Sequence, residues 1–153
     1  MRVPRNLLRL FLVFSLWLGP FETRLEAGDA AQRVQLRIGS ILASNKTGDC
    51  DPKLAKLDQL KVFKYPCYRL LREDSQNATW NVDATFEIPG GRSLIVTPQE
   101  RRDNQLSLKV RLIERGKPVS DTTVRLKEGG NFLLGGPPHE GGVLILSISA
   151  ASS

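Results

Sequence analysis

The chain has 153 residues, and 22 lysines and arginines against 16 aspartates and glutamates give it a formal net charge of +6. This length excludes a two-domain organisation, because a chain of this size builds one core. The two cysteines and single histidine are too few for a structural zinc site, which needs four nitrogen or sulfur ligands. The basic residues are scattered, which favours a solvated, mildly cationic surface over a dedicated polyanion site.

Residues 1–30 are predicted to be a secretory signal peptide. Three arginines precede an apolar run over residues 10–21, and small residues follow at Ala27 and Ala30. A membrane anchor is the alternative, but it needs about 20 apolar residues and this run is shorter. Cleavage after Ala27 or Ala30 would leave a single β-rich domain, 31–153, in the periplasm or outside the cell. No integral membrane segment would then remain.

Cys50 and Cys67 are predicted to form a disulfide, because two cysteines in an oxidising compartment are usually bonded. The alternative is two separate buried thiols. Asn45 and Asn77 each begin an Asn-X-Thr pattern in a predicted loop, so both are candidate glycosylation sites if the source organism glycosylates exported proteins.

The first predicted elements are a strand, a helix and a second strand. Apolar and polar residues alternate over 34–38, and this strand continues through residue 43. Asp51 as N-cap and Pro52 at the first helical position start one short amphipathic helix, 52–62. Another strand begins at Tyr68.

Short strands fill the remainder. Alternation is clearest over 106–112, and the unbroken apolar start of 143–148 indicates a strand buried on both faces. The other predicted strands are 80–88, 94–96 (ended by Pro98), 119–126 and 132–134, with a hairpin turn at 114–117 and a loop at 135–142. Seven or eight strands predict a mainly β fold, a β-sandwich or partly closed barrel with one short N-terminal amphipathic helix; the alternative is α+β.

The candidate catalytic features are few. The glycine-rich stretch 129–142 lacks the Lys-Ser/Thr and helix of a phosphate loop, so it is interpreted as two tight turns. The only histidine, His139, lies in this stretch without a nucleophile motif, and we expect a solvated loop side chain. We therefore predict no catalytic residues, no metal and no cofactor, and a protein that is not an enzyme.

Residues 61–69 interleave basic and aromatic side chains, as single-stranded nucleic-acid sites do. Export argues against nucleic acid as a partner, and Phe63 and Tyr68 are expected to be buried where helix meets strand. An exposed Tyr65 would remain for contact with a protein or glycan. Together with Trp80 and Arg92 it forms the candidate contact surface.

The segment Asp121–Gly136, with Thr122-Thr123-Val124-Arg125 and a closing Gly135-Gly136 before a last strand, resembles the end of the membrane domain of bacterial secretins. The chain lacks the repeated periplasmic modules of that family, so the resemblance does not imply a channel. More broadly, 41–45, 65–71, 88–92 and 142–150 look like a group of small exported bacterial proteins of uncharacterised role.

The leading functional hypothesis is a non-catalytic envelope or periplasmic binding domain. It would act through contact with another envelope protein, for which a secretion or pilus-type assembly is a candidate, and exposed strand edges are natural docking sites. A glycan- or peptide-binding module is the alternative, and a small hydrolase is third. The sequence leaves the partner and the oligomeric state open.

Overall fold

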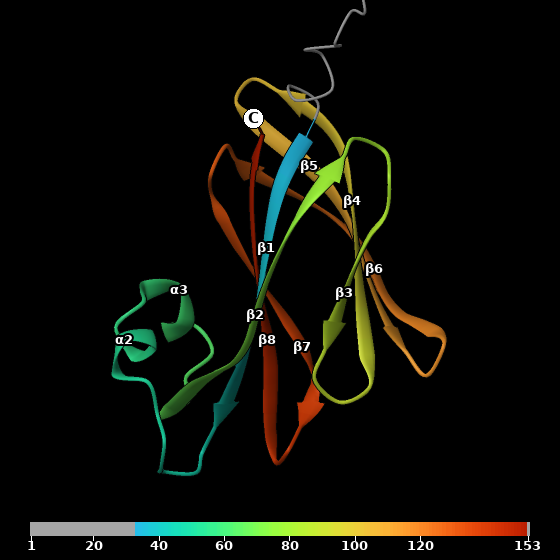
Figure 1. The fold of residues 1–153 in the computed structure, drawn as a ribbon. Coiled ribbons are helices and arrows are strands. Elements are labelled where there is room, and N and C mark those ends of the chain that lie inside the picture. The colour runs from blue at the N-terminus through green and yellow to red at the C-terminus, as the bar shows by residue number, and fades with distance from the viewer. Residues whose placement is uncertain (1–32, 153) are drawn as a thin grey trace, which may run out of the picture.

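The computed structural model describes residues 33–152, and the predicted signal peptide lies outside this range. Eight antiparallel strands form two four-stranded sheets (Figure 1). We call the sheet with strand order β2-β1-β8-β7 sheet A and the sheet with order β3-β4-β5-β6 sheet B. The strands are β1 (Arg33–Ser44), β2 (Cys67–Thr79), β3 (Ala84–Ile88), β4 (Arg92–Arg102), β5 (Gln105–Glu114), β6 (Lys117–Lys127), β7 (Asn131–His139) and β8 (Gly142–Ser152).

The main core lies between the two sheets, which confirms the predicted mainly β fold as a sandwich. Alternate residues of each strand face inward, since strand side chains have a period of two. Leu36 and Ile148 from sheet A and Phe86 and Leu108 from sheet B are fully buried there. Each Leu or Phe buried in this way stabilises the fold by about 1.5–3 kcal/mol relative to an exposed one.

A second, smaller core covers part of the outer face of sheet A. Ile41 and Ile145 point to this side, and Leu60 packs on them from the chain segment between β1 and β2. In β8, Leu144, Ile145 and Leu146 are all fully buried, so the predicted burial of this strand on both faces is confirmed.

The segment that covers this core contains two short helices instead of the one predicted over 52–62. Helix α2 (Pro52–Ala55) begins as expected, with the Asp51 carboxylate accepting a hydrogen bond from the Lys53 amide. Leu57 then takes an extended conformation (ψ 122°) before helix α3 (Asp58–Lys61). This break interrupts the helix and accompanies the burial of Leu60 against sheet A.

Two predicted strand boundaries were wrong. Trp80 and Val82 belong to a turn, because pairing of β2 ends at Thr79 and Asn81 has a positive φ of 63°. Pro98 does not end a strand, since a β-bulge at this proline lets β4 continue to Arg102.

The predicted loop 135–142 is also wrong over most of its length. β7 runs through it to His139, and a shift of register between Gly135 and Pro138 accommodates the glycines and prolines. The chain reverses at Glu140 and Gly141, which both have positive φ, as a two-residue type I′ hairpin turn requires. The predicted turn at 114–117 is confirmed, with positive φ at Arg115 and Gly116.

Candidate protein-binding edge

Strand β6 is one of the two outer strands of sheet B and is hydrogen-bonded to β5 alone. In an antiparallel sheet, alternate residues of an edge strand direct their N–H and C=O groups away from the sheet. Within residues 33–152, the backbone of 118–126 makes no hydrogen bond beyond its ladder with β5. We call this unpaired side the β6 edge, and Figure 1 shows its hairpin with β5 projecting at the side of the sandwich.

The β3 and β2 edges are partly closed. β3 has only five residues, and the carbonyl of Thr85 accepts a hydrogen bond from Nε2 of Gln76 at 2.7 Å. On β2, the carbonyl of Tyr68 accepts a hydrogen bond from the amide of Asp51, also at 2.7 Å. Each closure removes a backbone group that an added strand would need.

The β7 edge is closed in another way. Pro137 and Pro138 have no N–H to donate, and the strand is irregular between Gly135 and Pro138. The carbonyl of Pro138 also accepts a hydrogen bond from Arg92. The β6 and β7 edges lie on the same side of the sandwich. Of the two, β6 is the longer and more regular strand, so it is the better site for strand addition.

The β6 edge carries positive charge that the protein does not balance. The acidic residues near it are engaged, since Glu114 pairs with Arg92 at 3.4 Å and Asp121 with Lys109 at 3.8 Å. Within the part of the chain that the structure describes, four cations of the β5–β6 hairpin and β6 have no ion-pair partner: Arg115, Lys117, Arg125 and Lys127.

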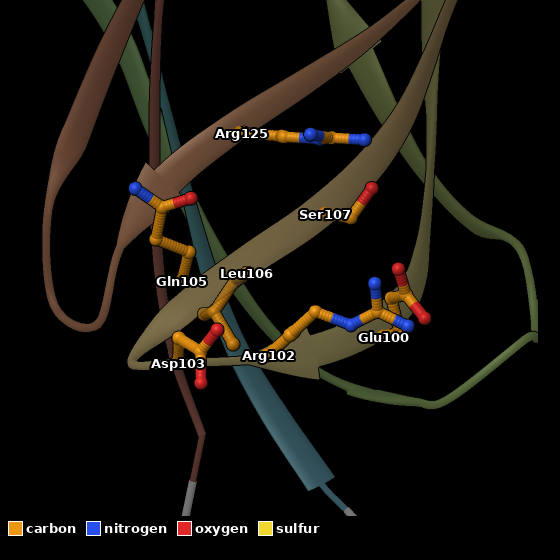
Figure 2. Close-up of a pocket in the computed structure, with 7 residues that line it drawn as sticks. All are labelled: Glu100, Arg102, Asp103, Gln105, Leu106, Ser107 and Arg125. Carbon is orange, nitrogen blue, oxygen red and sulfur yellow. The ribbon is translucent and has the colours of Figure 1, made fainter.

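A hollow of about 240 Å³ lies on the outer face of sheet B beside this edge. Arg125 is in register with Ser107 of β5, which is in register with Glu100 of β4. In Figure 2 the Arg125 side chain extends across Ser107, and Glu100 and Arg102 lie together on the far side. Arginine binds carboxylates by charge-assisted hydrogen bonds. The residues lining the hollow are Glu100, Arg102, Asp103, Gln105, Leu106, Ser107 and Arg125.

The predicted contact residues Tyr65, Trp80 and Arg92 do not form one surface. Tyr65 is half-buried against the small core on the outer face of sheet A, and Trp80 packs against the main core between the sheets. Arg92 is only 8% exposed.

Arg92 joins the two sheets at one end of the sandwich. Its Nη1 donates to the carbonyl of Pro89 at 3.0 Å, and its Nη2 donates to the carbonyl of Pro138 at 3.1 Å. Nη1 also lies 3.4 Å from Nδ1 of His139, and Nη2 lies 3.4 Å from the Glu114 carboxylate. These contacts give Arg92 a structural role.

The expectation of a solvated His139 is wrong. Its side chain is 12% exposed, because β7 extends to this residue and places the ring beside the Arg92 guanidinium. Nε2 lies 3.8 Å from the Glu140 carboxylate. The surroundings of the ring are therefore an arginine and a carboxylate at the end of the sandwich.

The predicted disulfide between Cys50 and Cys67 is present and closes the segment that carries α2 and α3. The expected burial of Tyr68 is confirmed, and Phe63 is partly buried. Asn45 lies in an exposed loop, as predicted, whereas Asn77 lies on an exposed position of β2 and not in a loop.

Residues 33–152 lack the features of two other kinds of site. In this range no helix is long and apolar enough to cross a membrane. No cluster of three histidine, cysteine, aspartate or glutamate side chains suited to a metal ion occurs in the same range.

The sequence predicted the strand 119–126 but not its place at the edge of a sheet. The sequence does contain a signal of an edge position: the strand is bordered by Lys117, Pro118 and Lys127. Lysine and proline are typical of edge strands. The absence of closing contacts along β6 depends on residues distant in sequence. The unpaired state of the β6 edge is therefore visible only in the three-dimensional structure.

The fold and this edge define an antiparallel β-sandwich with an open, cationic edge strand. No protein-family model matches the chain, and no curated protein matches it. Among solved structures the chain is similar to the InvG secretin domain β-barrel from the Salmonella SPI-1 injectisome, with 13% sequence identity and a TM-score of 0.41. The match covers 80% of this chain and 63% of that chain, so this chain spans less than two thirds of its neighbour's length.

Proposed function

We propose that this protein is an exported, non-catalytic binding domain that receives an extended segment of another envelope protein as a fifth strand of sheet B. The observation that carries the proposal is the β6 edge, an 11-residue strand paired on one side only. An exposed edge of this length is a template for β-strand addition, in which main-chain hydrogen bonds supply the affinity.

The composition of β6 supports strand addition. Valine and threonine, which favour extended structure, occupy Val119 and 122–124, and the Val119 side chain is 53% exposed. β6 can present side chains to a partner on both faces, since its residues alternate between the core and the solvent. Exposed apolar surface beside free hydrogen-bonding groups is typical of an interaction site.

Export is supported by two features. The predicted signal peptide at 1–30 directs the chain out of the cytoplasm. The Cys50–Cys67 disulfide fits an oxidising compartment, because reducing conditions in the cytoplasm oppose stable disulfides. The chain would therefore meet its partner in the periplasm or outside the cell.

The test is position-specific photocrosslinking in the native envelope. A photoreactive residue at Val119 reports on the β6 edge, and one at the exposed Asn77 of β2 is the matched control. We expect a defined adduct from Val119 and none from Asn77.

Proline substitution makes this test specific for strand addition. Thr122 and Thr123 are neighbours, so one of them directs its N–H toward β5 and the other toward the open side. Of Thr122→Pro and Thr123→Pro, the variant that retains the β dichroism spectrum blocks the open side, and it should lose the adduct. Equal adducts from Val119 and Asn77, or an adduct that survives this proline, would contradict the proposal.

A further inference from the structure

We infer that the segment that adds to β6 is acidic, with carboxylates two residues apart that face Arg125 and Lys127. This inference rests on the proposed strand addition and goes further, because it names the chemistry of the partner. The first support is the charge of the edge, where four cations lack an ion-pair partner in the described part of the chain: Arg115, Lys117, Arg125 and Lys127.

The spacing follows from the register of sheet B. Arg125 is in register with Ser107 and Lys127 with Gln105, so both cations lie on the outer face of the sheet. Side chains of an added strand that face the same side recur at every second residue. Directly opposite pairs of unlike charge stabilise a sheet, and like charges destabilise it. Carboxylates at positions i and i+2 therefore match Arg125 and Lys127.

The excess charge lies at the edge and not in the hollow of Figure 2. Glu100 and Asp103 line the hollow with Arg102, so that its β4 side holds charges of both signs. Arg125 stands on the β6 side of the hollow, and Lys127 follows it on the same strand. An acidic ligand is thus favoured beside Arg125 and Lys127, since the carboxylate of Asp121 on the same strand is paired with Lys109.

The same charges disfavour a second copy of this chain as the occupant. An antiparallel pair of two β6 strands would bring Arg115 and Lys117 of one copy toward Arg125 and Lys127 of the other. Like charges opposite one another destabilise such a pair. Charge complementarity therefore selects an acidic partner over self-association.

The test uses three synthetic peptides in which acidic, neutral or basic residues alternate with Val and Thr. Their sequences are Glu-Val-Glu-Thr-Glu-Val-Glu-Thr and the same peptide with Gln or with Lys in place of Glu. We expect the Glu peptide to bind about tenfold more tightly than the Gln peptide at low salt, because several cross-strand charge pairs act together. The preference should shrink as salt screens the charges.

Paired variants locate the effect. Arg125→Gln with Lys127→Gln should abolish the preference for the Glu peptide. Lys53→Gln with Lys64→Gln removes the same charge from exposed positions around α2 and α3 and should retain the preference.

The outcomes separate this inference from the function on which it rests. Equal binding of Glu and Gln peptides, both blocked by the open-side proline in β6, would overturn the acidic specificity and leave strand addition standing. A Glu-peptide preference that is insensitive to the proline would overturn strand addition. Sedimentation that shows concentration-dependent dimers, lost with the same proline, would overturn the acidic partner in favour of a second copy.

Discussion

Nη2 of Arg92 in β4 donates a hydrogen bond of 3.1 Å to the carbonyl oxygen of Pro138 in β7, and this contact joins sheet B to sheet A. The arginine starts β4 directly after the Gly90-Gly91 turn, and the proline lies at the irregular end of β7. This hydrogen bond, between strands of different sheets, holds the two sheets together at this end of the sandwich. It also occupies a carbonyl on the β7 strand.

Replacing Arg92 should therefore weaken the fold. We expect Arg92→Leu to lower the free energy of unfolding by about 3 kcal/mol, because Glu114 and the carbonyls of Pro89 and Pro138 lose a buried charged donor. Urea unfolding followed by dichroism measures the change. Arg72→Leu is the control, since Arg72 pairs with Asp74 on the exposed surface and should alter stability far less than Arg92→Leu does. Equal effects of the two substitutions would contradict the role given to Arg92.

The hydroxyl of Tyr68 anchors the segment that carries the helices. It donates to the carbonyl of Leu60 at 2.7 Å and accepts a hydrogen bond from the amide of Tyr65 at 3.2 Å. Because Tyr68→Phe leaves both backbone groups without this partner, we expect a loss of about 1–3 kcal/mol in unfolding free energy. Tyr65→Phe is the matched control and should be nearly neutral. Thermal unfolding of Tyr68→Phe and Tyr65→Phe under the same conditions measures the two losses of stability, and equal losses would contradict the anchoring role of the Tyr68 hydroxyl.

Loss of the disulfide should destabilise the whole domain. Cys50 and Cys67 are 17 residues apart, and a loop of this size contributes about 3 kcal/mol through the restricted unfolded chain. The double variant Cys50→Ala with Cys67→Ala should show this loss in urea unfolding. Addition of a reductant should weaken the natural protein by a similar amount and leave the double variant unchanged. If a reductant also weakened the double variant, the loss of stability in the natural protein could not be assigned to the disulfide.

Asp83 should contribute a small pH-dependent stabilisation. The Thr97 hydroxyl donates to its carboxylate, Arg111 donates to it at 2.8 Å, and these contacts hold the pKa of Asp83 below its usual 3.8. The folded-state pKa is the lower one, so the contribution is complete above the ordinary carboxyl pKa and is lost as pH falls through the folded value. Asp83 is exposed, so solvent screening keeps the effect small.

Urea midpoints measured from neutral pH down to about pH 2 test this expectation. Asp83→Asn should be slightly less stable than the natural protein at neutral pH, and the two should converge at the acid end. A constant difference across the whole range would mean that the carboxylate charge is not responsible.

The β architecture was predictable because alternation is a local signal. Residues 106–112 alternate cleanly and form the middle of β5, and the continuous apolar run of β8 correctly indicated burial on both faces. Local signals failed where tertiary pairing overrides them. Pro98 and the Gly135-Gly136-Pro137-Pro138 run would end isolated strands, but bulges keep both segments within their sheets.

The candidate site was less predictable than the fold. Arg92 and His139, 47 residues apart in the chain, meet only because β4 begins and β7 ends at the same end of the sandwich. Likewise, the cations of β6 are unremarkable in the sequence until the pairing of Asp121 with Lys109 and of Glu114 with Arg92 leaves them unbalanced. Strand order and ion pairing are properties of the whole fold, and residue periodicity does not encode them.

Hydrogen–deuterium exchange of the β6 amides tests the central claim most directly. The full chain would be compared with and without a saturating amount of the alternating Glu-Val-Glu-Thr peptide. The account predicts new protection within Lys117–Lys127, confined to alternate amides that face away from β5. Unchanged exchange along β6 despite peptide binding, or new protection confined to sheet A, would contradict it.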